Sequence, residues 1–207
     1  LGWSRELISR IENDRLDNVP FGKIQACINA LGGYLRTDVL WHGEQLHRLM
    51  DARHAAIQNA LVRLVESLGW TSRVEVSFNH YGDRGRIDVL AWHPRTGSLA
   101  VVEVKSVLGD VQDTLGRLDV KVRLAREIAG GIGWTVSSVV PVLVLAEGTN
   151  QRRHVAEHGA LFGGFEVRGR SAMAWLRHPR GTSPRGLLLF LRLPDSRVSD
   201  ARRRSRR

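Results

Sequence analysis

The sequence contains a single cysteine and no long apolar run. Cys27 has no second cysteine to pair with, so the chain cannot form an internal disulfide or a cysteine-based structural zinc site. The longest apolar stretch, VVPVLVLA at 139–146, is too short to cross a bilayer, and the N-terminus does not resemble a signal peptide. These absences argue against a disulfide-rich secreted protein and a membrane protein. We expect a cytoplasmic protein with no membrane partner.

The composition that remains is that of a globular protein with a basic excess. Hydrophobic residues make up 43% and charged residues 25% of the 207 residues, and the formal net charge is +10. A chain of this length and composition can bury a core. The last seven residues, ARRRSRR, hold five arginines and no acid, so we expect 195–207 to form a disordered basic tail that is either simply solvated or grips phosphates. The rest of the excess indicates a polyanionic partner, and we expect DNA.

The first 33 residues predict two helices joined by a loop. Ser4 is placed to cap the first helix, while Pro20 suits the start of the second and Gly32 its end. The pair resembles the back half of a phage-repressor-like helix-turn-helix domain, with LGWS matching the turn and RELISRIE the recognition helix. The resemblance implies that the following side chains face the major groove of DNA: Ser4, Arg5, Glu6, Ser9 and Arg10.

The helix-turn-helix match is incomplete. The two helices that normally precede the turn are absent from the sequence. We therefore expect 1–43 to be a partial DNA-binding segment without strong sequence-specific binding of its own, and a packed helical pair that does not bind DNA is the alternative.

A long amphipathic helix and a three-stranded meander follow. The helix spans 44–68, with Gly69 placed to end it. The strand at 73–79 alternates apolar and polar residues, and a short turn leads from it into GRIDVLAWHPRTGSLAVVEVKS at 85–106. That stretch predicts two further strands joined by the turn PRTG, which makes the three strands antiparallel.

The turn PRTG sets the register of the last two strands. If His93 and Ser98 close it, Leu90 faces Val101 and Asp88 falls opposite Glu103. One face of the meander is then predicted to be wholly apolar: Val74, Val76, Phe78, Ile87, Val89, Ala91, Ala100, Val102 and Val104. The charged side chains are predicted to share the other face: Glu75, Asp88, Glu103 and Lys105.

The charged face also carries apolar residues, so we expect a helix to cover part of it. Two opposed carboxylates in such a place repel each other and lose hydration, and they need a cation. Lys105 supplies one positive charge, and a divalent metal would supply the rest. All-oxygen ligation favours Mg²⁺ or Mn²⁺ over zinc. The alternative is a salt-bridged patch on a solvated face.

These residues carry a family resemblance. GRID, with fourteen residues between its Asp and the following EVK, resembles the PD-(D/E)XK nuclease superfamily, which has the restriction-endonuclease-like fold, and especially its Holliday-junction-resolvase-like members. The flanking elements fit, with helix 44–68 before the strands, a crossover helix at 110–129 and a buried strand at 136–146. We therefore expect an α/β domain over 44–194 with an αβββαβ core, in which helices flank a mixed sheet. A short basic helix, another short helix and a last strand pair complete the predicted domain.

The resemblance also implies roles for the charged residues. Asp88 and Glu103, with the backbone carbonyl of Val104, would hold Mg²⁺ or Mn²⁺ against a phosphate oxygen, and Lys105 would orient or deprotonate the attacking water. Glu75 would bind a second metal or position that water. Some relatives carry further site residues on the crossover helix. Gln112 and Lys121 are the candidates there, although we expect both to be solvated helix positions.

Two functions follow from the sequence. The first is a metal-dependent DNA endonuclease whose helix-turn-helix segment helps it to find DNA. The second is a transcriptional regulator whose nuclease-like domain binds DNA or dimerises without catalysis. We expect a homodimer.

One competing motif lies near the C-terminal end. HVAEH at 154–158 matches H-x-x-E-H, the signature of inverted zinc metallopeptidases, in a segment predicted to be helical. So short a pattern arises easily by chance, and no downstream acidic ligand stands out. We therefore do not expect a peptidase.

Overall fold

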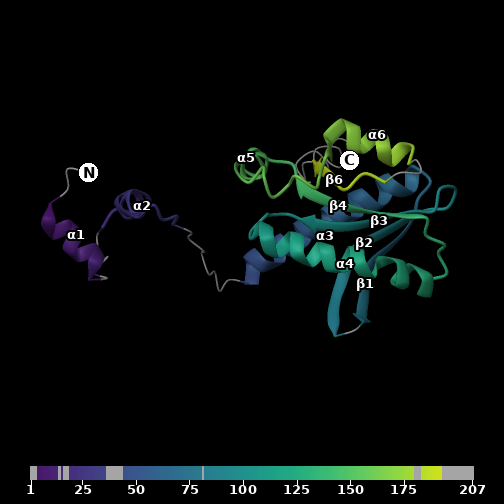
Figure 1. Ribbon diagram of the computed structural model, residues 1–207, viewed down its shortest axis with the longest axis horizontal. Coiled ribbons are helices and arrows are strands. Elements are labelled where there is room, and N and C mark those ends of the chain that lie inside the picture. The colour runs from purple at the N-terminus through teal and green to yellow at the C-terminus, as the bar shows by residue number, and fades with distance from the viewer. Residues whose placement is uncertain are drawn as a thin grey trace, which may run out of the picture. The chain divides into compact units, whose positions relative to one another are not determined.

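The computed structural model describes residues 4–13, 15, 19–35, 44–80, 82–179 and 183–192. The chain divides into two compact units, 1–43 and 44–207 (Figure 1). Within the described part, no helix combines the length and the apolar character needed to cross a membrane. The predicted basic tail and most of the LGWS turn lie outside the described residues.

The first unit contains helices α1 (Arg5–Glu12) and α2 (Phe21–Ala30). The Ser4 hydroxyl accepts a hydrogen bond from the Leu7 amide at 3.3 Å, which confirms the predicted cap. Of the described residues in this unit only Val19 is buried. Phe21 and other apolar side chains are exposed, so the described parts of the two helices do not enclose a core of their own.

The second unit alternates helices and strands. Its elements are α3 (Glu44–Ser67), β1 (Thr71–His80), β2 (Asp83–His93), β3 (Ser98–Lys105), α4 (Val111–Gly131), β4 (Ser138–Ala146), α5 (Thr149–Glu157), β5 (Val167–Arg168), α6 (Gly169–Arg177) and β6 (Leu187–Leu191). The predicted order of one helix, three strands, a helix and a strand is confirmed.

The strands form one mixed sheet in the order β1-β2-β3-β4-β6-β5. β1, β2 and β3 are antiparallel neighbours, whereas β3, β4, β6 and β5 run parallel. α4 is the crossover connection that lets β3 and β4 run parallel. His93 pairs with Ser98 and Leu90 with Val101, as the PRTG turn predicts.

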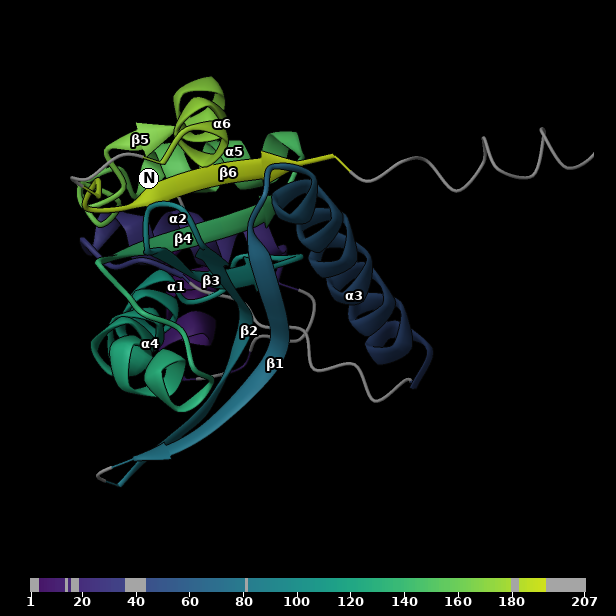
Figure 2. The same cartoon turned by 90° about the vertical axis from the view of Figure 1, so that its right-hand side faces the viewer.

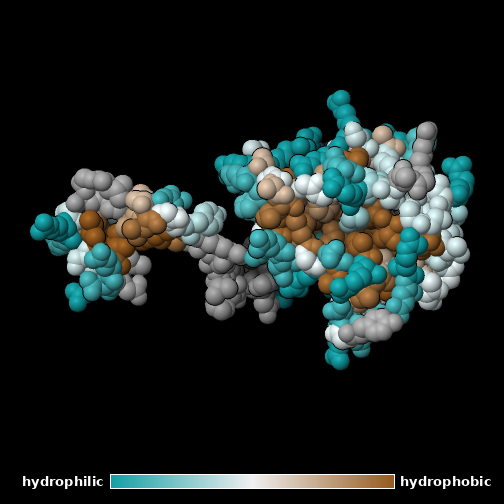
Figure 3. Space-filling model, viewed as in Figure 1, coloured by the Kyte–Doolittle hydropathy of each residue, from teal (hydrophilic) through white to brown (hydrophobic). Residues whose placement is uncertain are grey.

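Helices cover both faces of the sheet. Figure 2 shows α3 and α4 on opposite sides, with the strands between them. α3 buries Ile57, Leu61 and Val65 on its face of the sheet, where α6 also packs. α4 buries Leu118 and Ala125 on the other face, together with α5. In Figure 3 apolar residues, drawn brown, are also visible on the surface that carries α4, between polar side chains.

The prediction of one continuous apolar face is wrong where β1 pairs with the first half of β2. Val76, Phe78 and Ile87 pack on the α4 side, whereas the predicted apolar residues from Val89 onward pack under α3. Glu75 has a φ of 55°, in the left-handed region that non-glycine residues rarely adopt. At Glu75 the side chains of β1 stop alternating regularly between the two faces of the sheet. Because Val76 pairs with Ile87, both strands change face together.

Candidate functional site

The predicted acids and lysine meet where the pairing of β2 and β3 ends. The last paired residues are Val89 and Val102. Beyond this pair, the Val104 amide donates a hydrogen bond to Asp88 Oδ2 at 2.7 Å. The side-chain carboxylate of Asp88 thus accepts the hydrogen bond that a backbone carbonyl of β2 would accept in a regular sheet. The register, continued by this one residue, sets Asp88 against Glu103.

Glu103 is the centre of the cluster. It lies on the α4 side of β3 and is 3% exposed. Its Oε1 lies 2.9 Å from Lys105 Nζ, and its Oε2 accepts a hydrogen bond from Lys121 Nζ. Lys121 Nζ also lies 3.8 Å from Asp88 Oδ1. Two carboxylates and two ammonium groups therefore balance each other formally.

The expectation that Lys121 is a solvated helix position is wrong. It is 8% exposed, because it shares the buried face of α4 with Leu118 and Ala125. The rarity of lysine in the composition is a signal that could have drawn attention to Lys121. Among the 31 lysines and arginines only Lys23, Lys105 and Lys121 are lysines, and two of these three bind the same buried carboxylate. A compact ammonium is not interchangeable with a guanidinium at such a place.

The second weak candidate, Gln112, does not share this burial. It is exposed near the start of α4, as expected for a solvated helix position.

Glu75 reaches the site through a residue that the sequence reasoning missed. Gln58, on α3, donates from its Nε2 to Glu75 Oε1 at 2.9 Å and to the Asp88 carbonyl at 2.6 Å. Glu75 also pairs with Arg86. Gln58 and Arg86 thus hold the Glu75 side chain. The predicted regular alternation of side chains along β1 does not hold at this residue. A polar residue within the buried stripe of α3 was the available signal for Gln58, which is 7% exposed.

The environment of Asp88 disfavours its charge. Burial raises the pKa of Asp88 above its ordinary value of 3.8, and the neighbouring Glu103 raises it further. The Val104 amide, Lys121 and His54 of α3 act in the opposite direction but do not cancel the effect. A cation bound at Asp88 would relieve this penalty.

A pH-dependent prediction follows from this raised pKa. The folded state binds the Asp88 proton more tightly than the unfolded state does. Protonation of Asp88 therefore stabilises the folded protein, and this stabilisation is complete below pH 3.8 and is lost as pH rises through the folded-state pKa. We expect Asp88→Asn to raise the free energy of unfolding of the metal-free protein at pH 7, with no gain at strongly acidic pH. Urea denaturation in a chelator across this pH range measures it. A loss of stability at pH 7 would contradict the assignment.

The donor atoms of the cluster fit a hard divalent cation. Asp88 and Glu103 offer carboxylate oxygens. The Val104 carbonyl lies on the same side of β3 as its amide, which reaches Asp88. An all-oxygen set of this kind suits Mg²⁺ or Mn²⁺ rather than zinc.

The residues predicted to contact DNA lie on and before α1. Ser4, Arg5 and Ser9 are exposed, and Arg10 is half-buried. The Ser9 hydroxyl accepts a hydrogen bond from the Asn13 side chain at 3.3 Å, and Ser4 caps the helix, so both serines have local structural roles. DNA contact by these residues stays a prediction.

Comparison with known proteins adds no assignment. The chain matches no protein-family model, and no curated protein matches it. Any proposal for its function depends on the fold and the site geometry.

Proposed function

We propose that the second unit is a magnesium-dependent DNA endonuclease of the PD-(D/E)XK type, and that the helical first unit assists DNA binding. The observation that carries the proposal is the convergence of Asp88, Glu103 and Lys105 where β2 and β3 part. The order of the surrounding elements, with α3 before the meander and α4 as the crossover, supports it.

Each residue of the cluster has a distinct role in this proposal. Asp88, Glu103 and the Val104 carbonyl would hold the cation, which would stabilise charge on the phosphate and lower the pKa of bound water. The Lys105 side chain is 33% exposed, so it reaches solvent and orients or deprotonates the attacking water. Lys121 holds Glu103 in place through the other carboxylate oxygen, Oε2.

The alternative function, a DNA-binding regulator without catalysis, is favoured by one observation. Lys121 and Lys105 together balance Asp88 and Glu103, so the cluster does not require a metal for charge balance. In such a protein the four residues form a structural ion-pair network, and the second unit binds DNA or a second copy of the chain.

A cleavage assay separates the two functions. The purified full chain is incubated with four-way-junction, single-stranded and duplex DNA, with Mg²⁺, Mn²⁺ or a chelator. We expect the wild type to cleave at least one substrate in the presence of metal only. We expect Asp88→Ala to abolish cleavage while DNA binding in a gel-shift assay persists.

The matched control for this assay is Asp119→Ala. Asp119 is an exposed aspartate on α4, two residues from Lys121, and its removal should leave cleavage unchanged. Identical behaviour of the wild type and Asp88→Ala on every substrate would overturn the endonuclease proposal and leave the regulator.

A further inference from the structure

A second cluster of metal-ligating side chains lies on α5, outside the carboxylate site. His154, Glu157 and His158 each bring one ligand atom within 4.8 Å of the other two. Their spacing of three and four residues puts them on one face of the helix. α5 ends at Glu157, and His158 is its C-cap.

The two imidazoles have nitrogen atoms to offer. His158 Nδ1 lies 3.0 Å from the His154 carbonyl, so a proton on Nδ1 satisfies that carbonyl and leaves a lone pair on Nε2. A hydrogen bond of this kind commonly orients a metal-ligating histidine. His154 Nε2 is buried and has no hydrogen-bond partner among the described residues. A buried polar atom without a partner carries a free-energy penalty that a bound ion removes.

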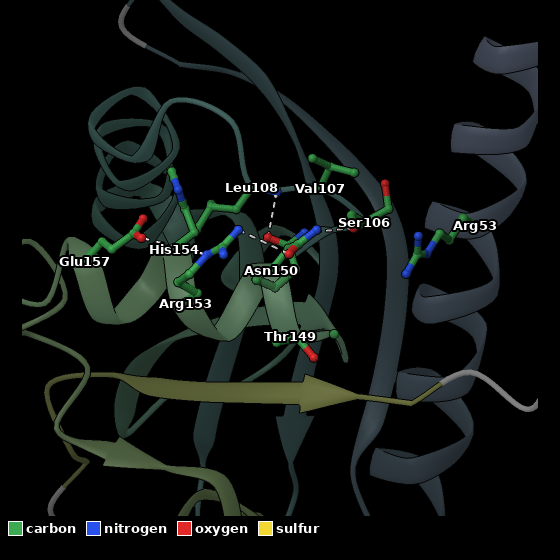
Figure 4. A pocket seen from close by; sticks show the side chains of 11 residues that line it. Arg53, Ser106, Val107, Leu108, Thr149, Asn150, Arg153, His154 and Glu157 are labelled. Atoms are coloured by element: carbon green, nitrogen blue, oxygen red, sulfur yellow. Dashed lines mark hydrogen bonds and ion pairs between the residues drawn. The ribbon is translucent and has the colours of Figure 1, made fainter. Parts of the chain in front are cut away.

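The cluster borders a cavity. His154 and Glu157 line a cavity of about 650 Å³. In Figure 4 Arg53, on α3, lies at the opposite end of the cavity from these two residues, and Ser106 lies between. Arg153 Nε and Glu157 Oε1 are as far as 3.8 Å apart, and both side chains are exposed. This ion pair is therefore weak. The Glu157 carboxylate is therefore available to bind an ion beside the cavity.

We propose that His154, Glu157 and His158 bind a transition-metal ion, Zn²⁺ in the first instance. Imidazole ligands select zinc and its neighbours over magnesium. Two histidines and one carboxylate leave a fourth position for water or a ligand from the cavity. The site is separate from the nuclease proposal. It involves no peptidase chemistry, although it gives the HVAEH segment a physical role.

Zinc titration of the chelator-treated full chain tests the site. The experiment uses a background of Cys27→Ser and Asp88→Asn, which removes the thiol and one acid of the carboxylate site, while Glu103 stays paired with Lys121 and Lys105. We expect one Zn²⁺ per chain by calorimetry and a visible absorption band when Co²⁺ replaces it. His154→Ala and His158→Ala should each abolish stoichiometric binding. Glu157→Gln should weaken binding at least about tenfold, since even outer-shell partners of a metal are worth that much.

The matched control is His178→Ala, which removes an exposed histidine that follows α6 and should leave zinc binding unchanged. Melting curves in chelator show whether each variant folds. If a histidine variant does not fold, exposed Glu157→Gln carries the test. The proposal is overturned if the background protein binds no stoichiometric zinc, or if the folded variants at all three ligand positions bind it as tightly as the background protein does.

Discussion

Replacement of Lys121 by methionine is expected to lower the free energy of unfolding by about 3–5 kcal/mol at neutral pH, the cost of removing one partner from a buried ion pair. The Lys121 ammonium is buried against Glu103 and lies 3.8 Å from Asp88. Without it, two desolvated carboxylates share only the partly exposed Lys105. Methionine fills a similar volume, so the loss reflects charge rather than a cavity. Urea denaturation in a chelator measures it.

Two comparisons make this result specific. Lys23→Met makes the same chemical change at an exposed lysine of the first unit and should alter stability by no more than about 0.5 kcal/mol. Adding Asp88→Asn to Lys121→Met should restore part of the loss, because one unpaired charge disappears. A Lys121→Met protein within about 1 kcal/mol of the wild type would show that Lys121 is not the counter-charge of the carboxylates.

Lys105 is expected to behave in the opposite way. Replacement by methionine should lower the single-turnover cleavage rate by about 10²–10⁴-fold, the usual contribution of a residue that transfers a proton in catalysis. Stability should change by no more than about 1 kcal/mol, because Lys105 is partly exposed and Glu103 keeps Lys121 as its partner. DNA affinity, measured by gel shift, should remain close to that of the wild type.

Lys105→Arg divides the two roles proposed for this residue. A guanidinium keeps the positive charge but does not release its proton in proteins, so it can orient water without acting as a base. Full recovery of the rate would assign Lys105 to orientation, whereas no recovery would favour proton transfer. A Lys105→Met rate within about tenfold of the wild type would contradict any catalytic role.

Local patterns were sufficient for much of the candidate site. The turn PRTG determines which residues of β2 and β3 pair, and the spacing of Glu103 and Lys105 places both on one side of a strand. These two rules predict that Asp88, Glu103 and Lys105 meet, and the structure brings them together. The same local reasoning predicted the order of α3, the meander, α4 and β4.

The remaining parts of the site come from distant helices. Lys121 reaches Glu103 across 18 residues of sequence, and Gln58 reaches the Asp88 carbonyl across 30. Helical periodicity shows that a helix has a buried face, but it does not show which polar residue on that face will meet a charge on the sheet. The positive φ of Glu75 has no local signal either, because a glutamate does not favour that conformation.

The sequence by itself determined the α/β order, the meander register and three of the four charged residues of the cluster, because turns and strand alternation act over a few neighbouring residues. Only the tertiary structure decided that Lys121 balances the two acids, that Gln58 ties Glu75 to Asp88, and that the strands change face at Glu75. These contacts depend on how α3 and α4 pack against the sheet, and that packing is decided by the whole core rather than by any one segment.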